Sequence, residues 1–243
     1  MLAIFRKEIN AFFSSLIGYI VIAVFLIVMG LFLFVFPDTS LLNYGYATLT
    51  PFFQLAPNVL LFLIPAICMR ALAEERQTGA IELLVTRPLR DSDIVLGKFW
   101  ACLLLVVIAL LPTLLYWYTI YRLAEPVGNV DVGGTLGSYL GLLLMSTTFV
   151  AIGLLASSLT TNQIVSYLLA LALTFWCYFG FDYLASLPVF YGNGDTSISR
   201  LGMQEHFASL GRGLIDTRDV VYFISLTGFF LVLTVLSLQR RRF

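Results

Sequence analysis

The sequence predicts an all-α integral membrane protein that crosses the bilayer six times. Of its 243 residues, 60% are hydrophobic and 12% are charged, whereas an average soluble domain is roughly 25% charged. A soluble protein of this length would have to cover its exterior with polar side chains, which this composition does not provide. The hydrophobic residues also form charge-free runs of the length that a helix needs to cross a bilayer core, about 20 residues.

Six stretches with few charges are expected to form the spans. The longest charge-free run, residues 132–181, has 50 residues and would measure about 75 Å as one helix, which exceeds the thickness of any bilayer. The polar stretch 157–163 is therefore expected to turn the chain between the fourth and fifth spans. The chain is read as one transmembrane domain over residues 1–243, with spans at approximately 16–36, 56–73, 97–121, 138–160, 163–187 and 220–238.

Residues 2–14 predict a separate amphipathic helix before the first span. Their apolar side chains recur at helical spacing, and the polar side chains lie on another face. The apolar set is Leu2, Phe5, Ile9 and Phe12, and the polar set is Arg6, Lys7 and Asn10. Such a helix would lie in the membrane interface. The alternative is that the segment only begins the first span.

The distribution of Lys and Arg predicts the orientation. With six spans, ten of these residues fall on one side of the membrane and four on the other, and the richer side is expected to be cytoplasmic. Both termini then lie in the cytoplasm. The richer side carries Arg6, Lys7, Arg70, Arg76, Arg87, Arg90, Lys98, Arg240, Arg241 and Arg242, and the other side carries Arg122, Arg200, Arg212 and Arg218. The net charge of zero provides no basic face for nucleic acid.

The loop between the second and third spans, residues 72–99, is dense in both charge signs. An apolar stripe at helical spacing predicts a short amphipathic helix in it, which Arg87-Pro88 would end because proline disfavours helix in the residue before it. The stripe consists of Ile81, Leu84 and Val85. This helix is a candidate docking surface for a cytosolic protein. The alternative is a solvated charged loop that only sets the topology.

A long helix is expected to follow this loop. Asp91 or Ser92 can cap its first turn. A helix from Ser92 to Tyr121 would be about 45 Å long, longer than the roughly 30 Å hydrocarbon core. The third span is therefore expected to begin in the cytosol.

Three motifs resemble those of a known family. Residues 75–84, ERQTGAIELL, are followed by Pro88 and Leu96-Gly97-Lys98, and together with residues 153–163, GLLASSLTTNQ, they resemble ABC-2 type transporter permeases. Residues 205–223, EHFASLGRGLIDTRDVVYF, resemble the gliding-motility-associated permease subunit GldF. Ala80 departs from the wider family, which often has Thr there. The resemblance implies six spans, an N-terminal elbow helix and a coupling helix in the first cytoplasmic loop.

The resemblance also implies partners. A separate cytosolic ATPase subunit would bind ATP and Mg, while this chain would bind no cofactor. A second permease, identical or paralogous, would stand beside it in the bacterial cytoplasmic (inner) membrane. The expected function is export of a substrate or transmission of force across that membrane. The residues expected to couple the chain to the ATPase are Glu75, Arg76, Gly79, Ile81, Glu82, Leu83, Thr86 and Arg87.

The chain shows no phosphate-binding loop of its own. Such a loop requires G-x-x-x-x-G-K-[ST], whose backbone amides surround a phosphate. Phe99 follows Gly97-Lys98, and Ser92 stands where the first glycine should be. The alternative function is a membrane scaffold or an intramembrane enzyme without an ATPase. Such an enzyme should show convergent Asp, Glu or His within its spans, and Asp182 is the one marginal candidate.

The outer segment 188–219 is longer than an ordinary unstructured connection. Its second half carries an amphipathic stripe, so we expect a helix that docks on another surface. The stripe consists of Met203, Phe207, Leu210 and Leu214. The GldF resemblance suggests a membrane-anchored extracytoplasmic subunit as that surface, and the alternative is a lid packed on the bundle itself. The residues assigned to this partner or lid are His206, Phe207, Leu210 and Arg212.

No metal site is predicted. His206 is the only histidine, and all three cysteines lie inside apolar runs, at spacings that suit neither zinc nor a disulfide framework. Glu205 could form an acid–base pair with His206, but a contact within the outer segment is the expected role of this histidine.

Overall fold

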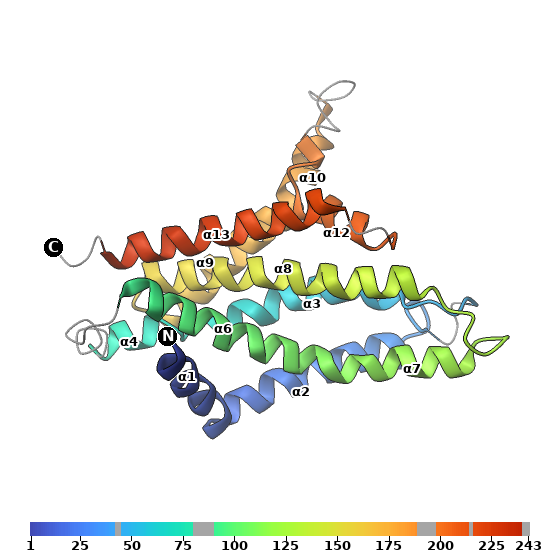
Figure 1. Ribbon diagram of the computed structural model, residues 1–243, viewed down its shortest axis with the longest axis horizontal. Helices are drawn as coiled ribbons and strands as arrows, with labels where there is room; N and C mark the ends of the chain where they lie inside the picture. Colours follow the sequence, from blue (N-terminus) through green and yellow to red (C-terminus); the bar gives the residue numbers. More distant parts are fainter. Residues whose placement is uncertain (42–44, 80–89, 189–197, 214–215, 240–243) are drawn as a thin grey trace.

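The computed structural model describes residues 1–41, 45–79, 90–188, 198–213 and 216–239. Six of the helices in these ranges are long and apolar enough to cross a membrane, which confirms the predicted all-α fold with six spans. They form an elongated bundle (Figure 1). Its proximal end gathers helices α1 and α4, the beginning of α6 and the end of α13. Its distal end lies where α7 ends and α8 begins.

The first span is preceded by a separate helix, as the sequence predicted. Helix α1 (Leu2–Ser14) ends where Ser15 adopts an extended conformation, and α2 (Leu16–Gly30) continues into the π-helical turn η1 (Leu31–Val35). Gly18 permits this sharp bend, because a Cβ there would lie 2.8 Å from the backbone oxygen of Phe12. Helix α1 consequently crosses the bundle at a steep angle to α2 (Figure 1).

The second span is helix α3 (Thr50–Cys68), which is followed after a short break by α4 (Ala73–Gln77). The third consists of α6 (Asp91–Leu110), the 3-10 turn η2 (Leu111–Thr113) and α7 (Leu114–Leu123). Pro112 lies in η2, where proline prevents a regular α-helical bond. The N-cap of α6 is Arg90, without a side-chain hydrogen bond, so the expected cap by Asp91 or Ser92 was wrong. Asp91 and Asp93 instead lie in the first turn, where the helix dipole favours a carboxylate.

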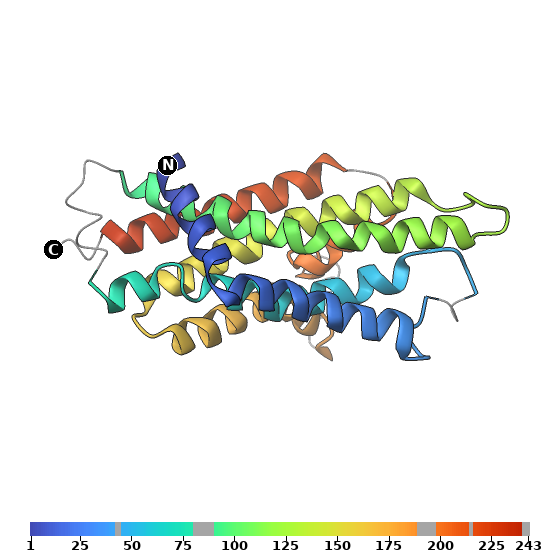
Figure 2. The same ribbon diagram turned by 90° about the horizontal axis from the view of Figure 1, so that it is seen from below.

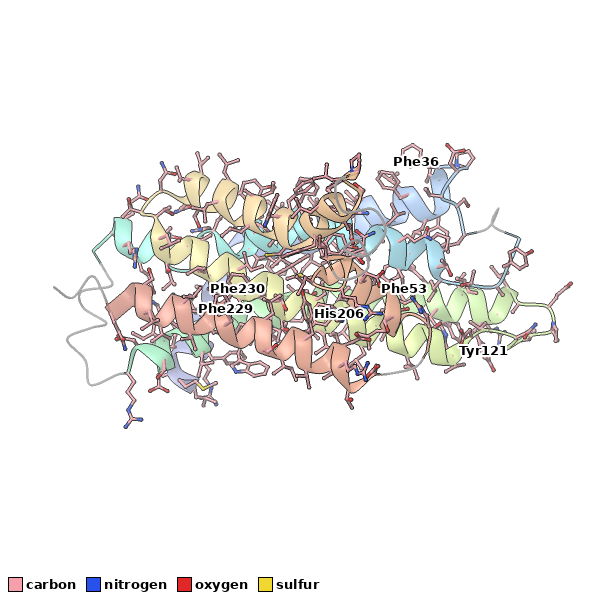
Figure 3. The ribbon with its side chains drawn as sticks, turned by 90° about the horizontal axis from the view of Figure 1, so that it is seen from above. Phe36, Phe53, Tyr121, His206, Phe229 and Phe230 are labelled. Carbon is pink, nitrogen blue, oxygen red and sulfur yellow. The ribbon has the colours of Figure 1, made fainter. Side chains whose placement is uncertain are left out.

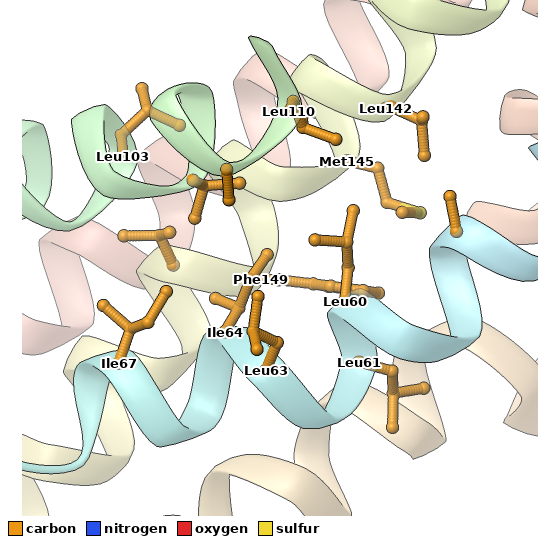
Figure 4. Close-up of a cluster of buried hydrophobic side chains, with 14 of the residues drawn as sticks. Leu60, Leu61, Leu63, Ile64, Ile67, Leu103, Leu110, Leu142, Met145 and Phe149 are labelled. Carbon is orange, nitrogen blue, oxygen red and sulfur yellow. The ribbon is translucent and has the colours of Figure 1, made fainter. Parts of the chain in front are cut away.

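Helix α8 (Val132–Leu159) is the centre of the bundle. It packs against α13 (Thr217–Gln239), α9 (Gln163–Phe175), α3 and α6. Phe149 and Met145 of α8 meet leucine and isoleucine side chains of α3 in the core (Figure 4). Gly153 lets the two helices approach closely, because a Cβ there would lie 2.6 Å from Cys68 Cβ. The three cysteines are free, and Cys68 and Cys102 are buried.

The fourth and fifth spans meet at the predicted polar turn. Helix α8 ends at Leu159, and Asn162 caps α9, accepting a hydrogen bond of 2.8 Å from the backbone of Ile164. Beyond α9, the π-helical turn η3 (Trp176–Gly180) leads into α10 (Phe181–Ala185), which leaves the bundle (Figure 1). Helix α12 (Met203–Leu210) returns to α8 and α13.

The helices extend beyond the predicted spans. The helices of the second and fourth spans begin at Thr50 and Val132 rather than at residues 56 and 138, whereas the third begins at Asp91, beside the expected start at Ser92. Hydropathy identifies the part of a helix that lies in the hydrocarbon core, whereas backbone hydrogen bonding continues into more polar turns.

Candidate functional site

A buried lysine stands at the proximal end of the bundle. Lys98, in the second turn of α6, is 1% exposed. Its ammonium group donates a hydrogen bond of 2.8 Å to Glu8 Oε1 of α1 and forms an ion pair of 2.9 Å with Glu75 Oε2 of α4. An isolated buried ammonium would be strongly destabilising, and these two carboxylates compensate its charge.

Lys7 completes this cluster. Its ammonium group donates a hydrogen bond of 2.8 Å to Glu75 Oε1. Burial alone would lower the pKa of Lys7, but the hydrogen bond and negative charge of Glu75 outweigh it, and the pKa lies above its ordinary value. We call Lys7, Glu8, Glu75 and Lys98 the proximal ion cluster. Two positive and two negative charges make it neutral, and it joins α1, α4 and α6.

Gly97 allows α1 to reach the cluster. A Cβ at this position would lie 3.0 Å from Ile4 Cβ and 3.2 Å from the backbone oxygen of Met1. Ile4 is the buried residue of α1. Gly97 and Lys98 belong to the motif that resembles the permease family. Gly97 allows close packing of α6 on α1, and Lys98 adds a charge to the same contact.

Ser157 stabilises the break between α3 and α4. Its buried hydroxyl accepts hydrogen bonds of 3.0 Å from the backbone N–H groups of both Leu72 and Ala73, and donates one of 3.2 Å to the carbonyl of Met69. Ser157 belongs to the second motif, at the end of α8. The second motif therefore contacts the chain directly before the first motif, at the proximal end.

The structure locates part of the predicted coupling set. Glu75 is buried within the proximal ion cluster, Arg76 is half-buried on α4 and Gly79 follows α4 with a φ of +69°. Ile81, Glu82, Leu83, Thr86 and Arg87, and with them the predicted coupling helix, lie outside the described residues. Sequence reasoning placed Glu75 beside a docking surface, and it missed the partnership of Lys98 with Glu8. The position of Lys98 next to a long apolar run could have indicated this partnership, because a buried charge needs a partner of opposite sign.

The predicted partner or lid residues gather at α12. Met203, Phe207 and Leu210 are buried, and the apolar stripe faces the chain's own helix α8. Leu214, the last member of the stripe, is outside the described residues, and Arg212 is exposed. Glycines on α8 make room for α12, because a Cβ on Gly137 would lie 2.3 Å from the backbone oxygen of Leu210.

His206 fixes α12 to α13. Its Nδ1 lies 2.6 Å from Asp219 Oδ1, its Nε2 lies 2.8 Å from the carbonyl oxygen of Arg200, and its ring stacks on Tyr222 at 3.9 Å. Figure 3 shows His206 beside the beginning of α13. Its carboxylate partner is Asp219, not the neighbouring Glu205. No group of three or more potential metal ligands occurs in the part of the chain that the structure describes.

The part of the chain that carries Glu75 and Lys98 of the proximal ion cluster matches a known protein family. A family model described as "ABC-2 family transporter protein" matches residues 38–203, which is more than half of the 243-residue chain. The matched range contains α3, α4, α6 and α8, and with them Glu75, Lys98 and Ser157. A search of curated proteins found no match. The chain is a multi-pass membrane protein and belongs to the ABC-2 family of transporter proteins, as a permease component of an ABC transporter.

Proposed function

We propose that the chain is driven by a separate cytosolic ATPase, which binds ATP and Mg and docks on segment 80–89 at the proximal end. The observation that carries this proposal is the position of the two helices that flank the segment. Helices α4 and α6 lie at the same end of the bundle (Figure 2), and the proximal ion cluster holds them together. A protein that binds between them would act on the second and third spans at once.

The proximal end would face the cytoplasm. This orientation follows from the excess of Lys and Arg on that side, and it places both termini inside a bacterial cytoplasmic membrane. Single cysteines at Thr86 and Thr196, in a chain lacking the three native cysteines, test it. An impermeant maleimide added to intact cells should label position 196 and spare position 86, and the reverse pattern would overturn the orientation.

The permease would act with a second permease, either an identical copy or a paralogue, and would export a substrate or transmit force. The motif at residues 205–223 supports a gliding-motility-associated type. For α12 we favour the lid, because Phe207 and Leu210 face the chain's own bundle. An extracytoplasmic subunit would have to bind the exposed side of this helix or the exposed Arg212 that follows it.

Purification of the chain from its native membrane tests the docking directly. We expect an ATPase subunit to co-purify, and we expect Glu82→Lys and Leu83→Asp each to weaken its binding while membrane insertion is kept. Removing one partner of a buried charge pair at an interface costs about 2–5 kcal/mol, so the loss should be large for Glu82→Lys. Thr160→Asp, in the other turn at the proximal end, is the control. Unchanged co-purification and stimulated hydrolysis in both variants would place docking elsewhere.

A further inference from the structure

The proximal ion cluster links a helix outside the spans to both sides of the proposed docking segment. Glu75 lies four residues before Gly79, after which the described chain stops, and Lys98 lies eight residues after Arg90, where it resumes. Glu8 and Lys7 are on α1. A displacement of α4 or α6 therefore cannot leave α1 in place without breaking a buried ion pair.

Stability alone does not account for this cluster. Buried ion pairs often contribute no more than well-packed apolar side chains of similar volume, because the desolvation of the charges offsets their attraction. An apolar residue at position 98 could also fill the space beside Ile4 and Gly97. What the ion cluster adds is directionality, since it joins two defined carboxylates on two different helices at 2.8 and 2.9 Å.

The path from α1 into the membrane is short. Only Ser15, in an extended conformation, separates α1 from α2, and the bend packs Gly18 against the backbone of Phe12. No loop therefore stands between α1 and the first span to absorb a movement of α1. The cluster consequently connects α4 and α6 to the first span through α1.

We propose that Lys98 is a positioning residue for energy coupling, which holds α1 to α4 and α6 through Glu8 and Glu75 so that displacement of these two helices reaches the first span. This inference rests on the proposed function, because the displacement would come from the ATPase. In this proposal, α1 transmits the displacement of α4 and α6 to the first span.

The test uses the full chain with its ATPase and two readouts. Lys98→Met and Glu8→Gln should each lower permease-stimulated ATP hydrolysis at saturating ATP about tenfold or more, which corresponds to about 1.4 kcal/mol in the barrier. The KM for ATP and the recovery of the ATPase should stay at the wild-type level. Lys98→Arg keeps a positive charge that can pair with both Glu8 and Glu75, and it should retain hydrolysis. Arg70→Gln is the matched control, because Arg70 pairs at 2.8 Å with Glu74 of its own segment.

The second readout does not require an ATPase. Spin labels would be attached at Asn10→Cys on α1 and Gln77→Cys on α4, both exposed positions, in a chain without native cysteines. Their distance distribution should be narrow, should broaden in Lys98→Met and should stay narrow in Lys98→Arg. If Lys98→Met does not fold, Glu8→Gln provides the same comparison.

Wild-type hydrolysis in Lys98→Met and Glu8→Gln, or loss of hydrolysis in a Lys98→Arg chain that folds normally, would overturn the proposal. An unchanged label distance in Lys98→Met would do the same. If no ATPase associates with the wild-type chain, the proposed function fails. The label distances then still decide whether the cluster holds α1 in place.

Discussion

The hydrogen bonds of His206 show that a proton lies between its ring and the carboxyl group of Asp219. The carbonyl of Arg200 can only accept, so the Nε2 of His206, 2.8 Å away, carries a hydrogen. If the ring is neutral, Nδ1 can only accept, and an ionised carboxylate can also only accept. A distance of 2.6 Å between Nδ1 and Asp219 Oδ1 therefore requires a proton between them, either on the ring or on the carboxyl group.

Substitutions can separate the bond of His206 to Asp219 from its bond to the carbonyl of Arg200. Asp219→Asn keeps a donor for Nδ1, whereas His206→Ala removes both hydrogen bonds of the ring. We expect His206→Ala to lower the free energy of unfolding by about 1.5–3 kcal/mol, the range for hydrogen bonds to charged groups, and Asp219→Asn to lower it less. Unfolding titrations in bicelles measure both values. Equal losses would mean that the charge, rather than the number of hydrogen bonds, holds α12 to α13.

The sequence predicted the segment in which a functional residue lies better than it predicted the partner that the residue contacts. It identified His206 as part of a contact in the outer segment, but Asp219 is thirteen positions away, and nothing in a linear pattern selects it over Glu205 or Asp216. Glu75 was similarly assigned to a surface although it is buried. A charged side chain close to the membrane can face either solvent or a buried partner, and only the packing of α1 on α6 decides between them.

Helix α12 depends on glycines of the helix it covers. Gly137→Ala would place a Cβ 2.3 Å from the backbone oxygen of Leu210, and backbone cannot rotate away as a side chain can. We expect α12 to be displaced, and a cysteine at Ser209 to react faster with maleimide. Gly228→Ala on α13, where no atom lies within 4 Å of the added Cβ, is the control and should stabilise its helix by about 1 kcal/mol. Equal reactivity in both variants would contradict the packing.

The break between α3 and α4 offers a second comparison. Ser157→Ala removes the acceptor of two buried N–H groups, and an unsatisfied buried donor costs about 1–3 kcal/mol. The neighbouring Ser158 is also buried, but its hydroxyl donates to the carbonyl of Leu155 in its own helix, so its removal leaves no N–H group without an acceptor. In thermal unfolding, Ser157→Ala should therefore lower the Tm clearly more than Ser158→Ala. Comparable shifts would show that the break does not depend on Ser157.

Elements were predicted better than contacts because each arises from a local pattern. The amphipathic spacing of residues 2–14, the polar turn near 160 and the long apolar runs each correspond to an element of the structure. The departure of α10 from the bundle was not predicted. The turn η3 that precedes it is uncharged, as is the helix before it, so no charged break in the sequence marks the change.

The whole molecule is organised around α8, with two different ends. The proximal end concentrates charges that are paired across helices α1, α4 and α6, and the distal half carries a short helix seated on glycines. Charge counts and hydropathy predict which end of the bundle faces the cytoplasm. They do not predict that helix α1 is joined to α4 and α6, on both sides of the loop between the second and third spans. The contact between Glu8 and Lys98 spans ninety positions in the sequence.

Site-specific photocrosslinking tests the central claim most directly, namely that a separate ATPase docks between α4 and α6. A photoreactive phenylalanine analogue would replace Leu83 in the native host, and the same analogue at Asn129, in the loop at the distal end, is the control. Irradiation of intact membranes should join position 83 to an ATPase subunit, identified by mass spectrometry, and should leave position 129 free of it. Failure of position 83 to crosslink to any ATPase, or equal adducts at both positions, would contradict the account.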